Sequence, residues 1–170
     1  MPKLLRSNFI SSISTLTVGS IIAQSLAVLC APVLTRLYTP EELGSFTYLI
    51  SFTAVFMGII NGKYDMAVVT ETNEQKTFAL IKLSLIVGII LTILGSVIYI
   101  TYNILVLNSI DLKDVIFVFF VLLSYAFITV LTSYNNRHKE YKVITSVNII
   151  RSASQNIGGV ILGFFGPGRI

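Results

Sequence analysis

Residues 83–110 read LSLIVGIILTILGSVIYITYNILVLNSI, a stretch without a single Asp, Glu, Lys or Arg. About 20 apolar residues in an α-helix cross the hydrocarbon core of a bilayer, so this stretch is long enough to span one. The whole chain has the same bias: its 170 residues are 54% hydrophobic and 12% charged, with a mean hydropathy of +0.83. A soluble domain carries about a quarter charged residues. The composition therefore predicts a membrane protein and excludes a water-soluble fold.

Further apolar stretches on both sides predict an all-α, polytopic transmembrane helix bundle of about five helices within a single unit, residues 1–170. We expect the helices at residues 8–35, 41–62 or on to 70, 77–105, 114–135 and 143–166. The first is uncharged from Ser7 to Thr35, which is too long for the apolar core of a signal peptide. We therefore interpret it as a retained helix, with a kink at Pro32.

Most of the 12 Lys and Arg residues lie in the gaps between these stretches. Cytoplasmic loops of membrane proteins are enriched in Lys and Arg. If the N-terminus is cytoplasmic, the inside gaps hold eight basic residues: Lys3, Arg6, Lys63, Lys76, Lys82, Arg137, Lys139 and Lys142. The outside gaps hold three: Arg36, Lys113 and Arg169. The count predicts a multi-pass protein with its N-terminus in the cytoplasm, and it explains the net charge of +4 without a nucleic acid partner.

The second span opens with Thr39, Pro40, Glu41 and Glu42. Thr at the N-cap, Pro at the first helical position and Glu three residues after the cap are typical of a helix start. The Thr hydroxyl and the Glu carboxylate can each accept a hydrogen bond from a backbone N–H that the first turn leaves unpaired. We expect the second helix to begin here, at the membrane surface.

Polar groups inside the apolar spans are candidates for a substrate or coupling site, because an ionisable side chain is costly at bilayer depth. Lys63 and Asp65 interrupt the second span together with Asn61 and Gly62. Either they end the helix at the cytoplasmic surface, or the helix bends and carries them into a cavity. Arg151 lies inside the fifth span, where it either snorkels to the surface or lines a cavity. The full candidate set is Lys63, Asp65, Arg151, Gln24, Asn148 and Gln155.

A partly cationic, polar cavity suits an anionic or sugar-bearing substrate, since Arg and Lys pair with phosphate and amides with hydroxyl groups. Catalysis is not indicated, because His138 and Cys30 are the only His and Cys and no carboxylates form a pair. Glycines four residues apart, such as Gly159 and Gly163, fit helix packing rather than a phosphate loop. We expect no enzyme activity, no metal and no cofactor.

Three segments carry a family resemblance. Residues 31–46, APVLTRLYTPEELGSF, combine a Pro-x-x-x-Arg-Leu turn with Pro-Glu-x-x-Gly. Residues 63–68, KYDMAV, follow a basic-Tyr-acidic-x-Ala-aliphatic pattern, and residues 136–142, NRHKEYK, form a basic, aromatic loop. In this order the segments resemble the polysaccharide and O-antigen flippases of the Wzx type, in the multidrug/oligosaccharidyl-lipid/polysaccharide exporter superfamily.

The resemblance implies a larger transporter of two helical bundles around a central cavity, of which this chain is an N-terminal fragment. It implies movement of undecaprenyl-pyrophosphate-linked oligosaccharide from the cytoplasmic to the outer leaflet of a bacterial inner membrane, with lipids and the polysaccharide polymerase machinery as partners. Lys63 and Asp65 match the second motif, for which the resemblance implies that a charged pair serves substrate binding or proton coupling. The residues with a structural role in the turn are Pro32, Arg36, Pro40, Glu42 and Gly44.

Three other functions remain open. A small-molecule antiporter of the same superfamily fits the same helices. A non-transporting membrane scaffold or truncated remnant fits the length of 170 residues. A membrane glycosyltransferase or polymerase would normally have a large, charged external loop, whereas the longest gap here is the cytoplasmic one around Lys63 to Lys82.

Overall fold

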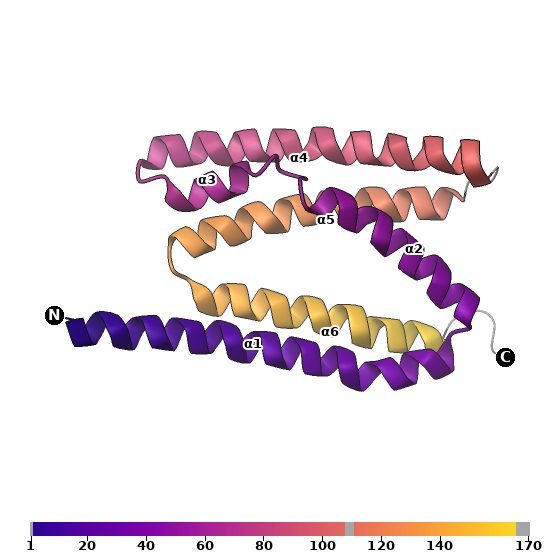
Figure 1. Cartoon of the computed structure of the whole chain (residues 1–170), viewed down its shortest axis with the longest axis horizontal. Helices are drawn as coiled ribbons and strands as arrows, with labels where there is room; N and C mark the ends of the chain where they lie inside the picture. The colour runs from indigo at the N-terminus through magenta and orange to yellow at the C-terminus, as the bar shows by residue number, and fades with distance from the viewer. Residues whose placement is uncertain (1, 108–110, 166–170) are drawn as a thin grey trace. The chain divides into compact units, whose positions relative to one another are not determined.

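The computed structural model describes residues 2–107 and 111–165. Within these ranges the regular elements are all helical, which confirms the all-α prediction. They are α1 (Pro2–Leu37), α2 (Pro40–Met57), α3 (Tyr64–Thr70), α4 (Glu74–Tyr102), the π-helical η1 (Asn103–Leu107), α5 (Leu112–Arg137) and α6 (Tyr141–Phe165) (Figure 1).

Three helices of the described chain are long and apolar enough to cross a membrane: Ile13–Leu37, Glu74–Val106 and Leu112–Arg137. They indicate a membrane protein, as the composition predicts. α2 has 18 residues, about 27 Å of helix against a hydrocarbon core of about 30 Å. α6 is interrupted by polar residues. The structure thus supports three of the five expected spans, and the other two remain a prediction.

The second helix ends earlier than the expected residue 62. α2 stops at Met57, and residues 58–63 form turns before α3 begins at Tyr64. Gly62 and Lys63 have φ angles of 57° and 63°, in the left-handed region that an α-helix cannot contain. Pro32, by contrast, leaves α1 helical to Leu37, and α1 curves near this end in Figure 1.

The chain divides into two compact units, and α1 and α6 belong to the first, which covers residues 1–44 and 139–170. The two helices lie side by side (Figure 1). Three hydroxyl groups bridge α6 to α1 or to Tyr38, the residue that follows α1: Thr145 Oγ1 donates to Thr15 O at 3.4 Å, Ser152 Oγ to Ala23 O at 2.6 Å, and Tyr38 OH to Gly159 O at 2.8 Å. Because later residues of α1 meet later residues of α6, the helices are parallel. The predicted topology also requires the first and fifth spans to be parallel, because both run from the cytoplasmic side outward.

Glycines let α1 and α6 approach closely. A Cβ atom on Gly19 would collide with the side chain of Thr145, and one on Gly163 would lie 3.0 Å from the Tyr38 ring. Gly159 lies beside Leu34 in the same way, at 3.3 Å. Without a hydrophobic force between helices in a bilayer, such close backbone contact is a main source of attraction. The packing role predicted for Gly159 and Gly163 agrees with these contacts.

The second unit, residues 45–138, packs α4 antiparallel to α5, with α3 against both. Phe52 and Phe56 of α2 pack on a buried cluster formed by Leu49, Ile60, Tyr99, Val118, Leu122 and Ala126. Its α4 helix has an unusual division of faces. The buried face is small or polar: Thr77, Ser84, Gly88, Thr92, Gly95, Ser96 and Tyr99. The exposed face carries large aliphatic side chains, including Ile86, Ile90, Ile93 and Val97. This polarity is opposite to that of a helix in water and suits one surrounded by lipid.

Substitution of Gly19 tests the α1–α6 contact. Gly19→Val should lower the free energy of unfolding by about 1–3 kcal/mol, because the larger side chain must push Thr145 away. Gly158→Val is the matched control, since a Cβ on Gly158 meets nothing within 4 Å. Thermal unfolding of the purified protein in detergent measures both variants. Equal losses in the two would mean that the close approach at Gly19 is unimportant.

Candidate functional site

The break between α2 and α3 lies in the middle of an apolar segment. Its turns are held by short-range backbone bonds: Ile59 N donates to Phe56 O at 2.9 Å, Gly62 N to Ile59 O at 2.7 Å, and Tyr64 N to Asn61 O at 3.1 Å. Backbone without regular helical bonding is tolerated at membrane depth only inside protein or beside a water-filled cavity. Discontinuous helices of this kind hold the ion and substrate sites of many transporters.

Asn61 is the most buried polar residue of the break, with 2% of its surface exposed. Its Nδ2 donates to Ala126 O of α5 at 3.1 Å. Its Oδ1 has no hydrogen-bond partner and rests on α4, where a Cβ atom on Gly88 would lie 2.5 Å away. Glycine at position 88 therefore makes room for the amide, and Asn61 joins α4 to α5 at the level of the break.

Two further hydroxyl oxygens on the same face of α4 are buried without a partner, Ser84 Oγ and Thr92 Oγ1. They lie one turn before and one turn after Gly88, on the face that Asn61 touches. An unpaired buried polar atom costs about 1–3 kcal/mol, so three in one region call for an explanation. The sequence did not single out Ser84 or Thr92, because isolated hydroxyl residues are common in apolar helices.

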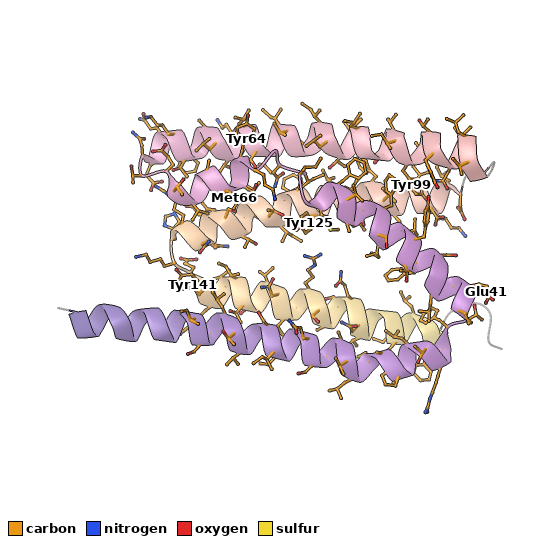
Figure 2. The ribbon with its side chains drawn as sticks, viewed as in Figure 1. Glu41, Tyr64, Met66, Tyr99, Tyr125 and Tyr141 are labelled. Carbon is orange, nitrogen blue, oxygen red and sulfur yellow. The ribbon has the colours of Figure 1, made fainter. Side chains whose placement is uncertain are left out.

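Lys63 and Asp65, which the second motif groups together, both lie at the start of α3, Lys63 at its N-cap and Asp65 in its first turn. Lys63 is exposed, whereas Asp65 is 9% exposed and lies in the first turn of α3. Its neighbours Tyr64 and Met66 are exposed (Figure 2). Within the described part of the second unit, the ion pair present is Arg137–Glu74, and no side chain pairs with Asp65. Lys63 and Asp65 therefore form no ion pair with each other in the described part of the second unit.

A polar stripe runs along α6. Asn148, Arg151 and Gln155 are three and four residues apart, so they share one face of the helix. Asn148 and Gln155 are exposed and Arg151 is half-buried. The adjacent face carries Ser152, which bonds to α1, and Asn156, whose Nδ2 donates to Ser152 O at 2.8 Å. At this level of α6 Ser152 makes the hydrogen bond to α1, while Asn148 and Gln155 are exposed on the first unit.

The remaining predicted positions are spread over α1 and the turn that follows it. Gln24 is exposed on α1, next to Ala23. Arg36 lies in the last turn of α1. The bonds expected at the start of α2 are present: Thr39 N donates to Glu42 Oε2 at 2.8 Å, and Glu42 N to Thr39 Oγ1 at 3.3 Å. Gly44 has open space around it, so packing does not require a glycine there.

Arg137, at the C-terminal end of α5, holds the linker between α3 and α4. Its Nε donates to Glu71 O at 2.9 Å, Nη1 to Glu74 Oε1 at 2.8 Å and Nη2 to Thr72 O at 3.3 Å. The Arg137 side chain is only 10% exposed, whereas that of Glu74 is 60% exposed. From the sequence, Arg137 is one of several basic residues in a predicted cytoplasmic loop. We refer to these three bonds as the Arg137 clamp.

Glu71 orders the same linker. Its Oε1 accepts hydrogen bonds from Asn73 N and Thr72 N, both at 3.0 Å. These bonds, the Asn73 one first, lower the pKa of Glu71 below its ordinary value despite an opposing desolvation, and Lys76 and Arg137 add to the lowering. Asn73 then caps α4, with its Oδ1 accepting from Gln75 N at 2.9 Å.

Comparisons with models of known protein families, with curated proteins and with solved structures found no match. The residues described above therefore carry the functional interpretation. In the part of the chain that the structure describes, no three His, Cys, Asp or Glu side chains gather as they do at a zinc or calcium site. The polar features that remain are the α2–α3 break, the α6 stripe and the Arg137 clamp.

Removal of the Arg137 clamp should destabilise the second unit. Arg137→Gln takes the hydrogen-bond donors away from two backbone carbonyls, and we expect a loss of about 1–3 kcal/mol in the free energy of unfolding. The ion pair contributes little of this, because Glu74 is exposed. Chemical unfolding in detergent measures the loss, with the exposed Lys82→Gln as control. An Arg137→Gln variant as stable as the control would contradict the role of the clamp.

Glu71 makes stability depend on pH in the acid range. Because the fold lowers the pKa of Glu71, its contribution is complete above the ordinary value of 4.5 and is lost as the pH falls through the lower folded value. Unfolding midpoints measured from pH 7 down to pH 3 should show a smaller loss in Glu71→Gln than in the unmodified chain. Glu140→Gln, at an exposed position, should keep the full pH dependence.

Proposed function

We propose that the chain belongs to a transporter that moves a lipid-linked oligosaccharide across the cytoplasmic membrane of a bacterium, with its N-terminus inside the cell. The resemblance of three segments to Wzx-type flippases suggests the substrate. The observation that carries the proposal is the polar stripe of Asn148, Arg151 and Gln155 along α6. A stripe of this kind facing lipid would be costly, so it requires a polar or water-filled neighbour.

The chemistry of the stripe fits a sugar unit on a pyrophosphate. The guanidinium of Arg151 can offer two parallel N–H donors to phosphate oxygens. The amides of Asn148 and Gln155, one turn to either side, can both donate to and accept from sugar hydroxyls. The apolar tail of such a lipid stays in the bilayer, so the protein has to shelter only the polar head.

The α2–α3 break supports a moving part. Gly62 adopts a left-handed conformation at no steric cost, and the segment around it has no regular helical bonds to break. Hinges in transport proteins are short segments of this type, which absorb backbone rotation while the helices remain rigid. The small face of α4 next to the break lets neighbouring helices approach closely.

A second candidate is a small-molecule antiporter of the same superfamily. The observation that favours it is Asp65, a buried carboxylate that no described side chain of its unit pairs with. A carboxylate in this position can exchange a proton or cation against a cationic substrate. Uptake assays in vesicles separate the two: a lipid-linked oligosaccharide should be moved in the first case and a cationic dye in the second.

Neutralising the stripe tests the leading function. Arg151→Gln in the chromosomal copy should lower surface polysaccharide by roughly tenfold, the effect of losing one charge-assisted bond to phosphate. Lys63→Gln should also lower it if Lys63 contacts the substrate. Lys142→Gln, an exposed cation at the start of the same helix, is the control.

Membrane insertion of each variant is checked by fractionation. Deletion of the gene should leave lipid-linked sugar units on the inner leaflet, which labelling of intact and opened vesicles detects. If Arg151→Gln inserts normally and polysaccharide export is unchanged, the proposed role of the stripe is wrong. If export is also unchanged in the deletion strain and that strain has no second flippase, the function itself is wrong.

A further inference from the structure

Lys82 lies on the face of α4 that carries large aliphatic side chains. It is exposed, and Ile86 and Ile90, which follow it at intervals of four residues, are exposed as well. Phe78, one turn before Lys82, is 54% exposed. Within the described part of the second unit, no carboxylate forms an ion pair with Lys82. Its ammonium group therefore stands at the edge of a surface that suits lipid, with no protein anion to balance it.

The adjacent helix α5 places the edge of this surface at a similar level. The Arg137–Glu74 ion pair joins the end of α5 to the start of α4, so levels on both helices can be counted from it. Lys82 follows Glu74 by eight residues, about 12 Å along α4. On α5 the last large exposed aliphatic residue is Leu131, six residues or about 9 Å before Arg137. Both helices thus become polar at nearly the same distance from the clamp.

An ammonium group is costly in hydrocarbon, and the four-carbon stem of Lys lets it reach the headgroup region. Anionic phospholipids in that region attract Lys side chains. We propose that Lys82 binds the phosphate of an anionic phospholipid in the leaflet on the side of the Arg137 clamp, and that this contact sets the depth of α4 in the bilayer. The proposal rests on the membrane location of α4 and is independent of the transported substrate.

This contact also sets the depth of the α2–α3 break. Gly88, against which Asn61 packs, follows Lys82 by six residues, about 9 Å toward the bilayer centre. The Arg137 clamp lies about 12 Å to the other side of Lys82, beyond the hydrocarbon core. With Lys82 at the phosphates, the break lies within the core and the clamp lies outside it.

The test uses the full chain in bilayers of defined composition. The protein is placed in nanodiscs of phosphatidylcholine, with or without phosphatidylglycerol, and unfolded thermally at equal ionic strength. Because a bound anionic lipid stabilises the folded state, phosphatidylglycerol should raise the apparent melting temperature by roughly 3 °C. Inorganic phosphate added to the protein in detergent should give no such shift. An equal shift with inorganic phosphate would indicate a site for free phosphate and would overturn the lipid assignment.

Variants locate the contact. Lys82→Gln should lose most of the shift, whereas Lys82→Arg should retain it because the positive charge is kept. Lys76→Gln is the matched control, since Lys76 is exposed on the same helix but lies six residues earlier and on another face. In detergent without anionic lipid, Lys82→Gln should unfold at the same temperature as the unmodified chain. A full phosphatidylglycerol shift in Lys82→Gln would mean that other groups bind the lipid, and the proposal would be wrong.

The depth of α4 is measured separately. The chain contains no Trp, so a single introduced Trp reports on one position. Phe78→Trp and Ile90→Trp replace exposed side chains four residues before and eight residues after Lys82. Lipids brominated near the ends of their acyl chains should quench the Ile90→Trp fluorescence strongly and that of Phe78→Trp weakly. Equal quenching at the two positions would contradict the location of Lys82 at the phosphates.

Discussion

In a bilayer the hydrophobic effect does not draw helices together, and this constraint governs the packing within each unit. Attraction must come from close backbone contact and from hydrogen bonds between helices. In the first unit the side chain of Thr145 packs against Gly19, and the Ser152 hydroxyl donates a hydrogen bond to the carbonyl of Ala23. In the second unit the side chain of Asn61 packs against Gly88, and its amide nitrogen donates a hydrogen bond to the carbonyl of Ala126. The large aliphatic residues of α4 face outward, where they suit contact with lipid.

The same constraint makes polar groups at the break informative. Water pairs with spare polar atoms at low cost on a soluble protein, but lipid offers no such partner. Three unpaired buried oxygens around Gly88 are therefore unlike the satisfied hydroxyl of Ser96, which bonds within its own helix. The two serines, about three turns apart on α4, thus differ in that Ser84 lacks the hydrogen bond that ordinary helix packing gives Ser96.

The sequence predicts those features that depend on neighbouring residues. The apolar runs predict the helices, and Thr39 with Glu42 predicts the start of α2, where the structure has the expected capping bonds. The predicted end of the second helix, residue 62, is later than the observed end of α2 at Met57. The left-handed backbone of Gly62 and Lys63 is a property of the folded chain and cannot be deduced from these two residue types. The Arg137 clamp could not be predicted from the sequence. Arg137 donates to the backbone carbonyls of Glu71 and Thr72, and because every residue has a carbonyl, no residue type marks these partners. Ser84 could not be identified from the sequence either, because only the structure shows that its hydroxyl is buried without a hydrogen-bond partner.

Helix α3 connects the α2–α3 break to the linker that the Arg137 clamp holds. It has only seven residues, Tyr64–Thr70, too few for a helix that is stable by itself, so its position depends on contacts at both ends. At one end, Asn61 ties the preceding turn to α5 through Ala126. At the other, Arg137 of α5 holds the carbonyls of Glu71 and Thr72. Since α5 holds both ends, α3 can turn against α4 only if one of these attachments is released. Asp65 lies in the first turn of α3, so any rotation of α3 carries this residue with it.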